Sequence, residues 1–217
     1  MTESVKPRRS YTSPLRTAQA EQTRARVLTA AGNEFAARGW TGTTIAGIAR
    51  AAGVSAETIY AGFGSKASIL EALIQHSLRG ADPGTPLMDQ PEPRAITASM
   101  DQAEQIRRFA VDITAVLGRV APLVAVARTA AHQDPELRAL YLALHAGRRR
   151  NLALFVGSLA RNGPLRRGLT VEAAIDDVFR LVSPELYLLL IEVEGLDSPA
   201  VARWVEDALA RLLTDRA

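Results

Sequence analysis

Apolar side chains recur every three to four residues along most of the chain, the spacing that places them on one face of a helix. Between residues 18 and 38, for example, Val27, Leu28, Ala31 and Phe35 fall on one face. No segment shows the strict alternation of a half-buried strand bounded by turn residues. The pattern therefore predicts an all-α fold of about nine helices.

Glycine, proline and capping residues divide this pattern into elements. Gly39, Gly53 and Gly64 are placed to end helices, and Ser55 and Ser65 are placed to begin them. Pro184 lies inside the predicted eighth helix and is expected to kink or restart that helix. The predicted helices span residues 18–38, 45–52, 56–61, 66–78, 100–118, 121–132, 135–162, 170–194 and 198–214.

Composition changes along the chain and indicates its organisation. Residues 1–17 carry several arginines and two prolines, which predicts a flexible basic arm. Residues 79–99 are rich in Pro, Gly and Asp, which predicts a linker. The linker separates a helical unit at 18–78 from a larger helical unit at 100–217.

The charge distribution is more informative than the formal net charge of +3 over 217 residues. The first 79 residues carry a net charge of +5, and the remaining residues carry −2. This asymmetry indicates an anionic partner, nucleic acid or a membrane surface, for the N-terminal part.

Several classes of chemistry are disfavoured by the residue content. The chain has no Cys, which excludes disulfides, thiolate metal sites and Cys nucleophiles. Its three His are widely spaced, and the HExxH, GxSxG and GxxxxGK[ST] motifs are absent. We expect no catalytic residues, no metal and no cofactor.

The chain also lacks targeting signals. Residues 1–16 are polar and basic, unlike a signal peptide, and the longest apolar run, Leu186 to Ile191, has six residues. We expect no helix that spans a membrane, and a cytoplasmic location.

Residues 44–63 form a short helix, a glycine turn and a second short helix. The small Ala49 lets the two helices approach, Gly53 makes the tight turn, and Ile48 and Ile59 fix the crossing. This is the geometry of a DNA-binding helix-turn-helix, in which the second helix enters the major groove. An ordinary helical corner is the alternative, and the basic N-terminal third favours DNA.

The stretch TTIAGIARAAGVSAETIYAGFGSK at residues 43–66 resembles the DNA-binding signature of the TetR/AcrR family. The resemblance covers about residues 18–78, and the rest of the chain resembles the family only in helical content and length. It implies an N-terminal three-helix helix-turn-helix domain and a C-terminal helical domain for effector binding and dimerisation.

The resemblance also implies roles for single residues. Thr44 and Lys66 would bind DNA phosphates, and Thr58 and Tyr60 would contact the backbone and thymine methyls. Base edges would lie near Ala56, Glu57 and Ala61. The two alanines cannot hydrogen-bond through their side chains, so direct readout is thin and is left to Glu57, Thr58, Tyr60 and Arg50. We therefore expect the arm residues Arg8 and Arg9 to reach the minor groove. In this scheme Ala46 and Gly47 occupy the outer face of the first motif helix.

In the C-terminal part the resemblance implies a cavity for a small molecule, and the aliphatic stripes favour a largely apolar one. Each polar residue on these stripes could instead be a satisfied ion pair or a rim position. The candidate ligand-binding residues are Phe109, Asp112, Ile113, Tyr141, His145 and Arg148.

Residues 183–193 are apolar nearly all round and must be covered on two sides. Together with the last helix they suggest a two-fold four-helix interface, although a central helix within one chain would show the same pattern. The candidate interface residues are Leu186, Leu189, Leu190, Trp204, Val205 and Leu212.

The sequence thus predicts a homodimeric, ligand-responsive transcriptional regulator, which in this family is most often a repressor. It would bind a palindromic operator in double-stranded DNA and be released by a small-molecule effector. The alternative is a helical small-molecule-binding protein without specific DNA binding, which leaves the motif and the basic N-terminal third unexplained.

Overall fold

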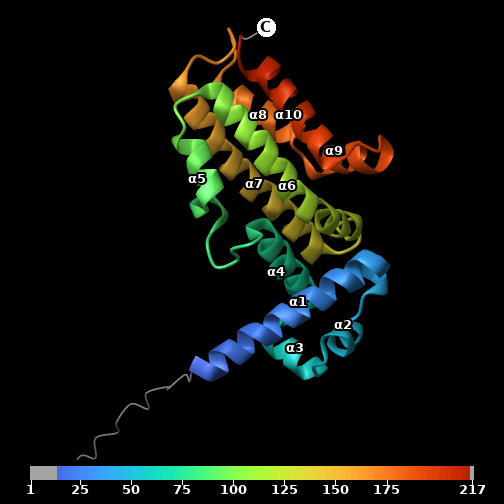
Figure 1. Cartoon of the computed structure of the whole chain (residues 1–217). Coiled ribbons are helices and arrows are strands. Elements are labelled where there is room, and N and C mark those ends of the chain that lie inside the picture. Colours follow the sequence, from blue (N-terminus) through green and yellow to red (C-terminus); the bar gives the residue numbers. More distant parts are fainter. Residues whose placement is uncertain (1–13, 216–217) are drawn as a thin grey trace, which may run out of the picture.

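The computed structural model describes residues 14–215, which fold into packed helices without a strand (Figure 1). The all-α prediction is confirmed. The helices are α1 (Pro14–Gly42), α2 (Ile45–Ala52), α3 (Ala56–Phe63), α4 (Lys66–Arg79), α5 (Pro91–Ala98), α6 (Gln102–Ala130), α7 (Pro135–Asn162), α8 (Val171–Leu181), α9 (Pro184–Leu188) and α10 (Ser198–Leu213). A short 3₁₀ turn, η1 (Leu87–Asp89), precedes α5, and a π-helical segment, η2 (Leu189–Val193), follows α9.

Helices α1 to α4 share one core at the N-terminal end of the molecule. The predicted inward residues Val27, Phe35, Ile48, Ile59 and Ile69 are all fully buried there. The last turns of α6 and the start of α7 complete this core with the side chains of Ala127, Ala130 and Leu137.

Helix α6 is longer than the hydrophobic pattern predicted. A break was expected between residues 118 and 121, but the helix runs through Pro122 without interruption. A proline inside a helix removes one hydrogen bond. Here both sides of the proline are held by buried contacts, because Val120, Ala121 and Val124 are all in the core. Tertiary packing therefore overrides the local signal.

The predicted linker at 79–99 contains a helix that the sequence pattern did not indicate. Helix α5 begins at Pro91, whose fixed φ suits a first helical turn, and it buries Pro93 and Ile96. Six prolines and glycines between residues 80 and 93 masked this short amphipathic segment.

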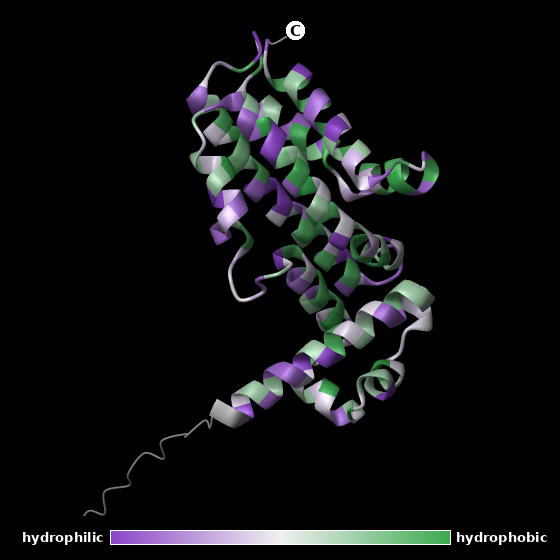
Figure 2. Ribbon diagram, in the orientation of Figure 1, coloured by the Kyte–Doolittle hydropathy of each residue, from purple (hydrophilic) through white to green (hydrophobic). Residues whose placement is uncertain are grey.

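Helices α5, α7, α9 and α10 pack against α6 in the larger unit, and α8 packs against α7 and α10. Figure 2 shows hydrophobic segments gathered where α4, α6 and α7 meet. By length and composition α6 could cross a membrane, contrary to the prediction that no helix could. Half of its most apolar stretch is buried inside this protein, as in the central helix of a bundle. The predicted restart at Ser183–Pro184 is confirmed, because Ser183 caps α9.

Candidate functional site

The α2–turn–α3 unit is built as the sequence predicted. Gly53 has φ 65°, in the left-handed region, and its N–H donates to the carbonyl oxygens of Ala49 and Arg50 at the end of α2. The Ser55 hydroxyl then accepts from the Thr58 N–H at 3.2 Å and starts α3. Ile48 and Ile59 are buried beneath the turn, so α3 is held at a fixed angle on the body.

Helix α3 presents the side chains that the motif predicts for reading DNA. Glu57, Thr58, Tyr60 and Ala61 are exposed, and Ala56 is half-buried. Tyr60 is 56% exposed, so it is open to contact from outside the protein. Hydrogen bonds from its own backbone and from Ser55 lower the pKa of the Glu57 carboxyl, which keeps that residue anionic.

Helix α2 offers its N-terminus and one basic side chain. The Thr44 hydroxyl accepts from the Gly47 N–H at 3.0 Å, so its own proton stays available to an acceptor such as a phosphate oxygen. Arg50 is exposed in the last turn. Gly47 is buried, contrary to the expected outer position, because a Cβ there would lie 3.2 Å from both the Glu34 carboxylate and the Thr44 hydroxyl.

Lys66 is engaged inside the protein. Its ammonium donates to the carbonyl oxygens of Trp40 at 2.7 Å and Thr43 at 2.8 Å, and it lies 4.0 Å from the centre of the Trp40 ring. Burial lowers the pKa of this ammonium, with the charge of Asp134 acting in the opposite direction. Two of the three N–H donors of this ammonium thus close the α1–α2 corner. The prediction had assigned Lys66 to a DNA phosphate and had not included this role.

Thr43 is a buried residue whose role the sequence analysis missed. Its hydroxyl lies 3.0 Å from the Glu34 carbonyl oxygen and 2.7 Å from the Gly39 carbonyl oxygen. These carbonyls lie around the kink of α1, where Gly39 has φ 60°. Thr43 therefore fixes the corner from which α2 starts. In the sequence, the available signal was a second threonine directly before the capping Thr44.

The predicted arm residues Arg8 and Arg9 lie outside the described residues. Among the described residues, Arg24 of α1 places a basic side chain over the end of α3, with its guanidinium carbon 4.5 Å from the centre of the Phe63 ring. Within residues 14–215, no group of three His, Asp or Glu side chains is arranged to hold a metal ion.

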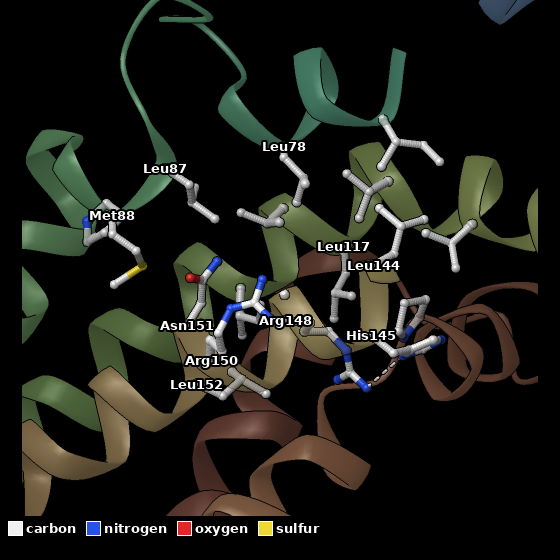
Figure 3. A pocket seen from close by; sticks show the side chains of 18 of the residues that line it. Leu78, Leu87, Met88, Leu117, Leu144, His145, Arg148, Arg150, Asn151 and Leu152 are labelled. Atoms are coloured by element: carbon white, nitrogen blue, oxygen red, sulfur yellow. Dashed lines mark hydrogen bonds between the residues drawn. The ribbon is translucent and has the colours of Figure 1, made fainter. Parts of the chain in front are cut away.

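A cavity of about 360 Å³ lies between α4 of the N-terminal unit and the helices of the larger unit. Leu78 of α4 and Leu87 and Met88 of the η1 turn bound one side, and Figure 3 shows Arg150 and Asn151 of α7 together on another. The inner wall is apolar and comes mainly from α6 and α7. Its apolar members include Ile74, Ile96, Phe109, Ile113, Val116, Leu117, Val120, Val124, Leu140, Leu144, Leu152 and Phe155.

Five of the six predicted ligand-binding residues line this cavity: Phe109, Asp112, Ile113, His145 and Arg148. Tyr141 does not line it, because its hydroxyl turns to the Glu185 carboxylate of α9 and donates to it at 2.8 Å. Burial, followed by this hydrogen bond, raises the pKa of Tyr141 to about 12.

Arg148 is tied to the C-terminal end of α8. Its guanidinium donates to the carbonyl oxygens of Phe179 at 2.8 Å and Val182 at 3.3 Å, and it stacks 3.9 Å from the centre of the Phe179 ring. Figure 3 shows the remaining contact, with His145. Burial lowers the pKa of Arg148 to about 10, and burial also lowers the pKa of His145, which favours neutral imidazole.

The predicted interface residues divide into two groups. Leu190 and Val205 are buried in the core of their own chain, and Leu186 and Leu212 are partly buried against it. Leu189 and Trp204 remain 45% and 38% exposed. Val193, which the prediction omitted, is 74% exposed at the end of the η2 segment. An exposed face therefore remains on the η2 segment and α10.

Comparison with known proteins agrees with this architecture. Residues 27–73 match the family model of bacterial regulatory proteins of the tetR family. No curated protein matches the chain significantly in sequence.

Solved structures match over most of the chain. FadR from Bacillus subtilis, in complex with stearoyl-CoA, has 20% identity and a TM-score of 0.66, covering 85% of this chain and 96% of its own. NalD from Pseudomonas aeruginosa, the secondary repressor of the MexAB-OprM multidrug efflux pump, has 19% identity and a TM-score of 0.67, covering 91% and 98%. The TetR-family regulator PfmR from Thermus thermophilus has 22% identity and a TM-score of 0.64, covering 88% and 100%.

The matched segment, residues 27–73, contains the whole α2–turn–α3 unit with its capping serines and the turn glycine. The likeness to the solved structures extends the agreement to the helices of the larger unit. The chain therefore carries the DNA-binding domain of the TetR family at residues 27–73, on the fold of TetR-family transcriptional regulators.

Proposed function

We propose that the protein is a ligand-responsive transcriptional repressor that binds a palindromic operator as a homodimer and leaves it when a small molecule occupies the cavity. Its place of action is the cytoplasm, where operator DNA and metabolites meet. The observation that carries this proposal is the position of α4, which belongs to the DNA-binding unit and to the cavity wall at once.

One face of helix α4 packs in the N-terminal core, and another face lines the cavity. Leu70 and Leu73 are buried in the core beneath the helix-turn-helix, while Gln75 and Leu78 line the cavity. Ile74 belongs to both sets. A ligand that displaces the cavity side of α4 must therefore shift the base on which α2 and α3 are mounted.

Both ends of α4 are also fastened to the larger unit. At its N-terminus the Ser65 hydroxyl donates to the Glu136 carboxylate of α7 at 3.1 Å. At its C-terminus the Arg119 guanidinium of α6 donates to the Ser77 carbonyl oxygen at 2.9 Å. A rotation of α6 or α7 around a ligand would thus be passed to α4 by direct hydrogen bonds as well as by packing.

Dimerisation follows from the small size of the reading surface. One α3 of eight residues supplies few contacts, whereas two-fold symmetry doubles them on a palindrome with half-sites about 34 Å, or a multiple of this, apart. The exposed Leu189, Val193 and Trp204 offer an apolar surface for the second copy.

Selection of genomic fragments by the purified full-length protein tests the DNA-binding part. We expect an enriched inverted repeat, and a loss of enrichment with Tyr60→Ala. The control is Glu21→Ala, which changes an exposed side chain of α1 rather than of α3. Enrichment without sequence preference, or an inverted repeat that Tyr60→Ala retains at full affinity, would contradict the assigned reading helix.

The repressor mechanism requires a ligand whose affinity differs between the two states, with a coupling free energy of about 1–3 kcal/mol. The named relatives support such a ligand, since FadR holds stearoyl-CoA and NalD represses an efflux pump. The check is operator affinity with and without the ligand. Equal affinities at saturating ligand would refute ligand release.

A further inference from the structure

Asp112 stands out among the cavity residues because its carboxylate has no protein partner. It lines the cavity from α6, it is half-buried, and no hydrogen bond or ion pair within residues 14–215 reaches it. Burial raises the pKa of this carboxyl, with the negative charge of Glu92 adding to the effect. A half-buried carboxylate without a partner has lost part of its hydration, so a ligand that supplies a donor gains affinity there.

The charged groups nearest to Asp112 are already occupied. The Glu92 carboxylate of α5 holds the Arg108 guanidinium through two bonds of 2.7 and 2.8 Å. Arg119, which lowers the pKa of Asp112, donates its Nε–H to the Ser77 carbonyl oxygen of α4. Neither basic side chain therefore neutralises Asp112 by direct contact.

The two basic residues of the cavity are held differently from Asp112. Arg148 directs its guanidinium to the carbonyl oxygens of Phe179 and Val182 and to the Phe179 ring, at the end of α8. Arg150 is exposed at the cavity mouth, where water solvates it. Two nitrogens of Arg148 are thus bonded while its buried Nε has no acceptor, and the charge of Glu185 opposes the lowering of its pKa; Asp112, in contrast, receives no hydrogen bond from residues 14–215.

The side chains around Asp112 indicate the size and the apolar character of a ligand that would bind there. One turn earlier on α6, Phe109 stacks on Phe155 of α7 with ring centres 3.8 Å apart, and both rings line the cavity. A cavity of about 360 Å³ corresponds to roughly a dozen water molecules by their share of liquid volume. It therefore suits a compact apolar ligand with an aromatic or aliphatic body.

We propose that the cavity selects a compact apolar amine, bound in its protonated form with the Asp112 carboxylate as counter-ion. This rests on the proposed function in taking the cavity as the effector site, but it concerns the chemical class of the ligand alone. The ammonium group donates to Asp112 while the apolar body packs on Phe109 and the aliphatic wall.

Three probes with one skeleton test the proposal: 4-phenylbutylamine, 4-phenylbutanol and 4-phenylbutyrate, titrated calorimetrically into the full-length protein without DNA. We expect the amine to bind about 10–100-fold more tightly than the alcohol, the range of a hydrogen bond between charged groups. The carboxylate should bind most weakly. Equal affinities, a preference for the carboxylate, or no binding of any of the three would overturn the proposal.

Two variants locate the effect. Asp112→Asn should abolish the preference for the amine while the alcohol keeps its affinity within about twofold. Glu71→Gln is the matched control, because Glu71 is an exposed carboxylate on the α4 side of the same cavity. If Glu71→Gln removes the preference and Asp112→Asn retains it, Asp112 is not the counter-ion.

A pH series on the wild-type protein covers the case in which Asp112→Asn does not fold. Protonation of the Asp112 carboxyl on acidification should weaken the amine and leave the alcohol unchanged, with Glu92 and Arg119 as the charged neighbours. An amine affinity that is independent of pH down to the unfolding range would refute the ion pair. Operator binding is measured separately, so a failed amine preference and a failed repressor function give distinct results.

Discussion

Lys66 offers a direct test of whether a motif residue serves DNA or the fold. The substitution Lys66→Met keeps most of the aliphatic side chain and removes the ammonium. Two hydrogen bonds to the carbonyl oxygens of Trp40 and Thr43 are lost, together with the cation–π contact to the Trp40 ring. The α1–α2 corner then keeps two carbonyl groups without this donor.

The cost follows from these contacts. A hydrogen bond from a charged donor contributes about 1.5–3 kcal/mol, and an exposed cation–π contact about 0.5–1 kcal/mol. Desolvation of the ammonium, visible in its lowered pKa, offsets part of this gain. We therefore expect a loss of about 1–3 kcal/mol, which for a chain of this size lowers Tm by roughly 3–10 °C.

Thermal unfolding and the salt dependence of operator binding are measured on the same variant. A phosphate contact contributes about 0.9 to the slope of log affinity against log salt, or about 1.8 for two protomers. We expect Lys66→Met to lower Tm and leave that slope unchanged. Arg50→Met, at an exposed position, should leave Tm unchanged and reduce the salt slope. A Lys66→Met protein with unchanged Tm and a slope reduced by about 1.8 would refute the structural role.

Four further substitutions test the fold, all by measurements without DNA. Gly53→Ala places a Cβ at φ 65° and should cost about 1–2 kcal/mol in urea unfolding, whereas Gly62→Ala, in helical α3 with open space around it, should gain about 0.5–1 kcal/mol; equal effects would contradict the left-handed turn. Gln105→Leu removes a buried amide that donates to the Ile96 carbonyl oxygen and the Ser158 hydroxyl, so a loss of about 2–4 kcal/mol is expected and one below about 0.5 kcal/mol would count against the network. Tyr141 has a folded pKa of about 12, above its unfolded value, so folded-state stability should fall as pH rises from about 10 to 12. Tyr141→Phe should remove this fall and the latest step in the absorbance titration at 295 nm; a titration identical to the wild type would refute the assignment.

The local signals of the N-terminal unit were strong enough to predict it. Gly53 could be identified because a tight turn between two amphipathic helices needs positive φ, and Ser55 because a hydroxyl there caps the next helix. The DNA contacts of Thr58 and Tyr60, which the resemblance to a known motif implies, stay predictions. The role of Lys66 did not follow, because its acceptors lie 23 and 26 residues away in sequence.

The larger unit was less predictable because its structure depends on contacts between distant helices. Pro122 is a helix breaker by local rules, yet α6 continues through it under tertiary packing. The five cavity residues identified from sequence lie on the apolar stripes of α6 and α7. Tyr141 lies on the same helix as His145, but only the position of Glu185 in α9 shows that its hydroxyl turns elsewhere.

Ala127, Ala130 and Leu137 have a practical consequence for attempts to exchange modules between regulators. They belong to α6 and α7 in sequence, but their side chains complete the core under α1 and α4. A chimera joined within residues 79–99 would receive foreign side chains at these three positions. The core beneath its first four helices would then be mismatched. Chimeras assembled from this chain should therefore keep residues 127–137 together with the first four helices. The alternative is to redesign these three positions to match the new C-terminal unit.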